Sequence, residues 1–260
     1  MMASHEEEIV TAKLFMNAAF PVLQVLMDES PKLKGKIFNH TIQFGAKDGG
    51  DLLCCHLIFR DGHLDVVQGP AERPDVTMTF SSVEKMNALL KGTGMSLPAI
   101  RGNVFTALSF LLNYLMGLKI MTNDPKNDRE KYLKVKCSLY MICRAMSTYN
   151  KLGDPDFHEF CLRQPDRIYQ FRVEEGDDPA KIACYLRVCQ GKSKSGHGVY
   201  KKRTPFVLFR FTSIDGALKV LNKEIEFVAA AERGYVETVG SPEYACYLND
   251  YMAIIQAMVT

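Results

Sequence analysis

The sequence predicts an α+β chain made of two tandem domains. The main observation is an internal repeat: residues 74–91 read PDVTMTFSSVEKMNALLK and residues 205–222 read PFVLFRFTSIDGALKVLN. In both segments a period-two apolar pattern, typical of a strand, gives way to an amphipathic helical pattern. A repeat sets the domain count, and a chain of 260 residues is long enough for two domains of ordinary size.

The chain begins with a predicted helix over roughly residues 7–28. Ser4 is the expected N-cap, and Glu6 to Glu8 follow it at the end of a helix that favours negative charge. Pro21 lacks a backbone N–H and clashes with the preceding turn. We therefore expect a kink near Pro21.

A strand followed by a tight turn is expected next, and the same pattern occurs in each half. Residues 53–59 and 182–188 are strand-like. Each precedes a glycine-containing hairpin signal, Asp61-Gly62 in the first half and Gln190-Gly191 in the second.

The repeated segment itself predicts a strand, a tight turn and a short helix. Residues 76–80 and 207–211 alternate in a way that buries one face of a strand. Ser81 and Thr212 are each followed three positions later by an acid, which is a helix-start signature. The apolar residues that come next fall on one helical face.

A second strand–turn–helix segment closes each half. In the first half, a strand around residues 100–102 precedes the apolar helical stretch 104–121. In the second half, Gly240 precedes Ser241 and Pro242, which are a good cap and a good first helical residue.

The two halves are joined by a polar linker at residues 123–128 and a second long helix over roughly residues 129–150. This helix precedes the second half as the first helix precedes the first half. The expected domains are residues 1–124 and 125–260. A duplicated chain of this kind is expected to form a pseudo-two-fold pair that imitates a homodimer.

The order of these elements resembles the sterol carrier protein type-2 superfamily. The resemblance is carried by FRDGHLDVVQGPAERPDVTMTFSS (residues 59–82) and IRGNVFTALSFLL (residues 100–112). The second half retains RTPFVLFRFTS and VGSPEYACYL. It covers roughly residues 30–121 and 155–260. It implies two tandem sterol-carrier-like domains, each a twisted sheet covered on one side by helices, arranged as a pseudo-dimer.

The same resemblance implies a function. Members of this family hold sterols, fatty-acyl chains or isoprenoid-type molecules in a hydrophobic tunnel between the sheet and the helices. We therefore expect a non-catalytic lipid carrier whose partner is an apolar small molecule. The alternative is an accessory or scaffold subunit that docks onto an enzyme of lipid, quinone or acyl-CoA metabolism and holds no ligand of its own.

The predicted ligand-binding residues lie mainly in the first half. The apolar helix 104–121 is the expected lid, and we predict that this copy is the binder because its lid is the more apolar one. The alternative is that this helix packs between the two domains. The predicted residues are Phe80, Met86, Phe105, Leu108, Leu111, Leu112, Leu115 and Met116.

Composition excludes several classes of protein. A net charge of +2 argues against nucleic acid as a partner. The acidic start MMASHEEEIV does not look like a signal peptide, and eight cysteines without one suggest a reducing cytoplasm. The stretch 104–121 contains Ser109, Asn113 and Lys119, so we expect no transmembrane segment, only transient membrane contact.

No motif predicts catalysis, a metal or a cofactor, so we expect no enzymatic activity. The cysteines lack zinc-ribbon spacing, although Cys54 and His56 would share a strand face. The basic segment 191–203 is predicted to be a hairpin that is either simply solvated or attracts an acidic protein or an anionic head group. Lys32, Lys34 and Lys36 form a similar cluster.

Overall fold

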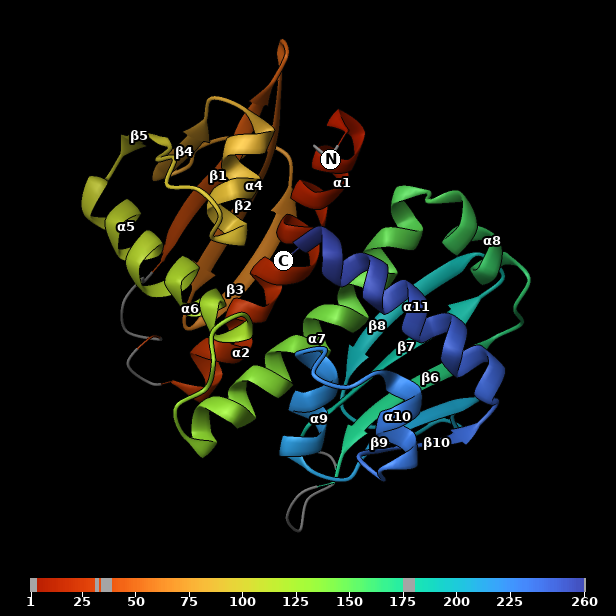
Figure 1. Ribbon diagram of the computed structural model, residues 1–260. Coiled ribbons are helices and arrows are strands. Elements are labelled where there is room, and N and C mark those ends of the chain that lie inside the picture. Colours follow the sequence, from red (N-terminus) through yellow and green to blue (C-terminus); the bar gives the residue numbers. More distant parts are fainter. Residues whose placement is uncertain (1–3, 31–32, 34–38, 175–180, 260) are drawn as a thin grey trace. The chain divides into compact units, whose positions relative to one another are not determined.

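The computed structural model (Figure 1) describes residues 4–30, 33, 39–174 and 181–259. The chain divides into two compact units, which are described separately. Unit 1 comprises Met1–Thr122 and Met258–Thr260, and unit 2 comprises Asn123–Ala257. The lysines predicted to form a cluster near residue 34 lie outside the described residues.

Unit 1 contains a five-stranded mixed sheet in the order β3-β2-β1-β4-β5. The strands are β1 (His40–Asp48), β2 (Asp51–Arg60), β3 (His63–Gln68), β4 (Val76–Phe80) and β5 (Ala99–Gly102). The β1–β4 pair is parallel and the other pairs are antiparallel.

Unit 2 contains a second five-stranded sheet in the order β10-β9-β6-β7-β8. Its strands are β6 (Arg167–Val173), β7 (Ala183–Cys189), β8 (Lys192–His197), β9 (Val207–Phe211) and β10 (Val236–Gly240). Here β6–β9 is the parallel pair. The two repeated strands, β4 and β9, therefore occupy the same place in their sheets.

The central strands β1 and β6 were not among the predicted elements. Both are buried over most of their length, on both faces. A strand covered on both sides loses the clean alternation of polar and apolar residues that marks a half-exposed strand. The missing alternation explains why neither central strand was predicted.

The first helix of unit 1 is continuous but changes its winding. It consists of α1 (His5–Leu14), a π-helical turn (Phe15–Ala19) and α2 (Phe20–Glu29). The predicted cap is confirmed, because the Ser4 hydroxyl accepts from the Glu7 N–H at 3.2 Å. The wider turn just before Pro21 is where a proline is expected to disturb the α-helical ladder.

The repeated helices, α4 (Val83–Lys91) and α9 (Ile214–Leu221), begin one residue later than predicted. Their caps are Ser82 and Ser213, not Ser81 and Thr212. Ser82 and Ser213 have extended backbones, and each accepts from the N–H three residues later. The cap is thus the next hydroxyl residue along the chain from the one that the spacing predicted.

The apolar stretch at residues 104–121 is also a helix of mixed winding. It runs through α5 (Val104–Ser109), a π-helical turn (Phe110–Leu115), α6 (Met116–Leu118) and a 3₁₀ turn (Lys119–Met121). By length and composition, this stretch and His5–Glu29 are long and apolar enough to cross a membrane. The His5–Glu29 window is 67% buried, as is usual for a core helix, whereas the other is 29% buried.

Unit 2 contains five α-helices within its described residues. The long helix α7 (Asp128–Leu152) and the final helix α11 (Pro242–Val259) confirm the predicted helices. Two short helices, α8 (Pro155–Leu162) and α10 (Phe227–Glu232), were not predicted. The start of α8 was visible in the sequence, since the Asp154 carboxylate accepts from the Phe157 N–H at 2.8 Å before a first-turn proline.

The basic segment 191–203 is partly a strand rather than a loop. Its first half forms β8, an edge strand paired with β7. Gln190 and Gly191 have φ values of 46° and 81°, as expected for a two-residue hairpin turn. Lys192 and Lys194 are exposed while Ser193 between them is buried, and residues 192–197 form the second strand of the predicted hairpin.

At the end of the last strand in each unit, a glycine allows the backbone just before the adjacent strand to come close. Gly240 has φ 111°, and a Cβ there would lie 2.1 Å from the Phe206 carbonyl oxygen. Gly102 has φ 92° and would meet the Asp75 carbonyl oxygen at 2.1 Å. Neither position tolerates a side chain without moving the backbone of the adjacent strand.

We expect Gly240→Ala to destabilise unit 2 by about 3 kcal/mol or more, because it adds a backbone clash to left-handed strain. Gly234→Ala is the matched control. Gly234 also has a positive φ, 72°, but a Cβ there meets nothing within 4 Å. It should cost only about 1 kcal/mol. Chemical denaturation followed by far-UV circular dichroism measures both, and equal losses would contradict the clash.

Candidate ligand-binding site

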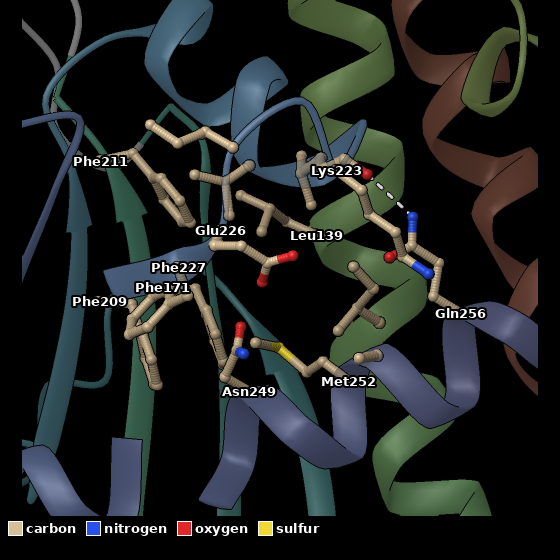
Figure 2. A pocket seen from close by; sticks show the side chains of 15 residues that line it. Leu139, Phe171, Phe209, Phe211, Lys223, Glu226, Phe227, Asn249, Met252 and Gln256 are labelled. Atoms are coloured by element: carbon tan, nitrogen blue, oxygen red, sulfur yellow. Dashed lines mark hydrogen bonds between the residues drawn. The ribbon is translucent and has the colours of Figure 1, made fainter. Parts of the chain in front are cut away.

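An apolar cavity of about 280 Å³ lies inside unit 2, between the sheet and its helices (Figure 2). Its floor is formed by Phe171 of β6 with Phe209 and Phe211 of β9. These side chains are on one face of the sheet because they occupy alternate positions on two paired strands. All three are buried.

Four helices supply the walls of this cavity. The lining side chains are Leu139 and Ile142 from α7, Val220 and Leu221 from α9, Phe227 from α10, and Met252 and Ala253 from α11, with Ile225 from the connection between α9 and α10. Elements far apart in the sequence therefore surround one space. The cavity is a product of tertiary packing and not of any single helix.

Aromatic rings define one side of the cavity. Phe171 and Phe209 are stacked with ring centroids 4.6 Å apart, and their planes differ by 3°. Phe227 meets Phe209 edge-on at 5.7 Å. Aromatic pairs in these geometries are mutually stabilising, so the floor is a fixed surface against which an apolar chain can lie.

Polar side chains gather at the opening. They are Lys223, Glu226, Asn249 and Gln256. Lys223 and Glu226 are exposed, which places the opening on their side. Figure 2 shows the Glu226 and Asn249 side chains directed toward each other across the cavity, and a dashed line for the 2.8 Å hydrogen bond that the Gln256 amide donates to the Leu221 carbonyl.

Lys223 adopts a left-handed backbone conformation, with φ 58°. The two copies of the repeat are 131 residues apart, so Lys223 corresponds to Gly92 of unit 1. Gly92 follows α4 directly and has a φ of 77°. A left-handed conformation costs a non-glycine residue about 1–2 kcal/mol. A lysine retained at this position, on the rim of a cavity, suggests that the side chain has a role that offsets the strain.

Exchanging these two residues tests the strain. We expect Lys223→Gly to stabilise unit 2 by about 1 kcal/mol and Gly92→Lys to destabilise unit 1 by a similar amount. A Cβ at position 92 meets nothing within 4 Å, so no clash confuses the reciprocal change. Thermal and chemical unfolding measure both; a loss of stability in Lys223→Gly would contradict the prediction.

The predicted ligand-binding residues of the first half are dispersed in unit 1. Phe80 and Met86 are buried in its core. Phe105, Leu108 and Leu112 are 87%, 48% and 64% exposed. Leu111 and Leu115 are half-buried, and the side chain of Met116 lies outside the described part of the structure.

Large aromatic side chains from the same helix pack into the core of unit 1. Phe110 and Tyr114 are buried, and Phe110 packs against Phe44 and Phe59 at 6.2 and 6.4 Å. The Tyr114 ring meets Phe59 at 5.2 Å, and its hydroxyl donates to the Leu33 carbonyl at 2.7 Å. These two aromatic side chains, which were not among the predicted ligand-binding residues, are core residues.

The predicted positions nevertheless reappear in unit 2. Counting onward from the matched glycines Gly102 and Gly240, Leu111 corresponds to Asn249 and Leu115 to Ala253. Both unit 2 residues line the cavity. In the strand repeat, Phe80 corresponds to Phe211, which also lines it. The same count pairs the buried Phe110 and Tyr114 of unit 1 with the smaller Leu248 and Met252 of unit 2.

The cysteines and histidines show no metal-binding arrangement among the described residues. His56, which shares a strand with Cys54, has its Nδ1 atom 3.0 Å from the Gly69 carbonyl oxygen. Cys143 and Cys184 meet with sulfurs 3.1 Å apart in the interior of unit 2. Burial raises the pKa of the Cys161 thiol to about 12 and that of Cys143 well above its ordinary value, which keeps both thiols protonated and unreactive.

Comparison with known proteins gives matches to solved structures alone. No family model matches the chain, and no curated protein matches it. Sterol carrier protein 2 like 2 from Aedes aegypti is 17% identical, with 45% of this chain and 97% of that chain covered and a TM-score of 0.30. Sterol carrier protein domain 2 of Helicoverpa armigera is 17% identical, with 51% and 94% covered and a TM-score of 0.33.

A match of another kind is the inverting sec-alkylsulfatase Pisa1 from Pseudomonas sp. It is 11% identical, with 64% of this chain and 31% of that enzyme covered, and its TM-score is 0.27. The sterol carrier matches thus extend over about half of this chain at low identity, and this chain spans about a third of the sulfatase. At these TM-scores the matches record similarity and do not assign a function to this chain.

Proposed function

We propose that this chain consists of two sterol-carrier-like units and is a non-catalytic carrier that binds an apolar chain in unit 2. The observation that supports this is the cavity of about 280 Å³ between the sheet and four helices. Its described lining includes no Ser, Cys or His, the side chains most often used as nucleophile or base. A lining of this kind offers burial rather than reaction.

The size of the cavity favours a single extended chain. Ligand pockets usually measure about 300–1,000 Å³, and this cavity lies just below that range. A fatty-acyl or isoprenoid-type chain suits it better than the fused rings of a sterol. Each methylene transferred from water gains about 0.8 kcal/mol, so the affinity should rise with chain length until the cavity is full.

The rim suits a polar head group. Lys223 carries a positive charge on the exposed side of the opening, and Asn249 offers an amide donor there. Since an acyl ligand must leave its carboxylate in or near water, these groups are placed to hold it. Glu226 on the same rim disfavours a second negative charge, which indicates a ligand with one carboxylate or a neutral amide or ester.

Several features predicted from the sequence belong to this proposal. They are the cytoplasmic location, the pseudo-dimeric arrangement of the two copies, and contact of the basic segment 191–203 with an acidic partner. The exposed side chains Phe105, Leu108 and Leu112 of unit 1 are proposed to contact the apolar ligand or a lipid surface during transfer. Replacing Phe105 and Leu108 by Ser should then slow transfer from vesicles without changing the affinity of unit 2.

Native mass spectrometry of the freshly purified protein, with lipid extraction, tests the proposal directly. We expect one apolar molecule per chain, and in titration an affinity that rises along a series of fatty acids and then levels off. Uptake of cholesterol but not of fatty acids would contradict the assigned ligand class. A mass that remains that of the bare chain after incubation with sterols, acyl chains and quinones would favour the docking-subunit alternative.

A further inference from the structure

A second groove of about 640 Å³ lies in unit 2 between α8 and α11. It is separate from the apolar cavity, and the two share no lining residue. Helix α11 contributes to both, with Asn249 and Ala253 lining the cavity and Tyr247 and Tyr251 lining the groove. The carrier function does not use this groove.

Four aromatic rings form the walls of the groove: Phe160, Tyr244, Tyr247 and Tyr251. Tyr247 stands nearly perpendicular to both Tyr244 and Phe160, at 89° and 71°, with centroids 6.2 and 6.4 Å away. Phe160 lies 5.5 Å from Tyr251. The ring pairs of the groove meet at angles from 44° to 89°, so their faces point in several directions, and a ring face attracts a cation.

Carboxylates surround these rings. The groove is lined by Asp156, Glu159, Glu243 and Asp250. The one basic side chain in the lining, Arg163, forms an ion pair with Glu159. The remaining three carboxylates give the groove a negative charge. Glu243 also accepts a hydrogen bond from the Tyr247 hydroxyl at 3.2 Å, which connects the charge to the aromatic wall.

The Tyr244 ring of the groove already contacts a cationic side chain of the protein, Arg167. The guanidinium carbon of Arg167 lies 3.9 Å from the Phe206 ring centroid and 4.5 Å from that of Tyr244. The Arg167 Nη1 atom is buried and has no hydrogen-bond partner among the described residues. The Phe206 and Tyr244 rings thus stabilise the buried guanidinium through cation–π contacts.

We propose that the groove between α8 and α11 binds an organic cation of the quaternary or alkylammonium class. The methyl or methylene groups of such a cation lie on the ring faces, and the carboxylates of Asp156, Glu243 and Asp250 balance its charge. A metal ion is a poor match, because the described residues contain no group of three acids, histidines or cysteines able to hold one. A bulky, weakly hydrated cation loses little by leaving water.

Titration with choline chloride, followed by calorimetry or by proton–nitrogen NMR shifts of residues 156–163 and 243–254, tests this assignment. The control ligand is 3,3-dimethyl-1-butanol, which has the shape of choline and no charge. We expect choline to bind with a Kd of about 1 mM or tighter. The uncharged alcohol should bind at least about tenfold more weakly.

Variants connect the binding to the groove. Tyr247 is 47% exposed, so Tyr247→Ala should fold normally and weaken choline binding about tenfold. Glu243→Gln should weaken it through the lost charge, whereas Tyr247→Phe keeps the ring and should retain it. Val228→Ala, which truncates an exposed side chain outside the groove, is the control that should leave choline binding unchanged.

Three results would overturn the assignment. The first is equal binding of choline and its uncharged analogue. The second is choline binding that survives both Tyr247→Ala and Glu243→Gln. The third is failure of choline to bind while a lysine-rich peptide does, which would make the groove a peptide site. None of these results bears on fatty-acid uptake in the cavity, so the two proposals fail independently.

Discussion

Ala253→Trp is expected to weaken binding of a long-chain fatty acid by about 100-fold, or about 3 kcal/mol. Ala253 lines the apolar cavity, yet it is exposed at the mouth. A tryptophan there can enter the opening without displacing a buried neighbour. The ligand then loses the volume that its chain would occupy, so the loss appears in affinity and not in stability. Displacement of a fluorescent fatty acid measures it.

Val228→Trp is the matched control for this substitution. Val228 lies on α10 beside the lining residue Phe227 but is 63% exposed and does not line the cavity. It should leave the affinity unchanged within about twofold, since surface substitutions away from a site have small effects. If Ala253→Trp binds fatty acid as well as the unmodified protein does, the ligand lies elsewhere. If both variants lose binding, the tryptophan acts through general disturbance of unit 2.

Phe44→Ala is expected to lower the free energy of unfolding of unit 1 by about 4 kcal/mol. Phe44 lies on the central strand β1 and is fully buried. Its ring packs against Phe20, Phe80 and Phe110 at 5.2, 5.4 and 6.2 Å. Truncation removes a contact shared by α2, β4 and the helix after β5, and leaves a cavity that such different elements cannot close together.

Urea denaturation followed by far-UV circular dichroism measures this loss, and hydrogen exchange of residues 40–80 assigns it to unit 1. The control is Phe105→Ala, which removes the same ring from an 87% exposed position and should change stability by no more than about 0.5 kcal/mol. Similar losses for the two variants would show that the Phe44 cluster does not hold the unit together.

The sequence predicted a ligand site beneath the helix that follows β5, and the cavity of unit 2 is lined at the matching positions. The repeat related Leu111 and Leu115 to Asn249 and Ala253, and the second pair lines the cavity. The most apolar helix was expected to cover the ligand. Hydrophobicity measures how much a helix needs to be buried, and it does not report whether space remains beneath it. Phe110 and Tyr114 are buried in unit 1, and the smaller Leu248 and Met252 stand at the matching positions of unit 2.

By itself the sequence determined the features that depend on near neighbours in the chain. The Ser4 cap, the Asp61-Gly62 and Gln190-Gly191 turns, the repeated strand–helix segments and the long helix α7 are all encoded within a few residues. The packing of distant segments determined three further features. They are which strands lie at the centre of each sheet, the exposure of Phe105 and Leu112, and the place of the cavity. These depend on whether side chains from distant segments fill the space between the sheet and its helices, and the periodicity of any one segment does not contain that information.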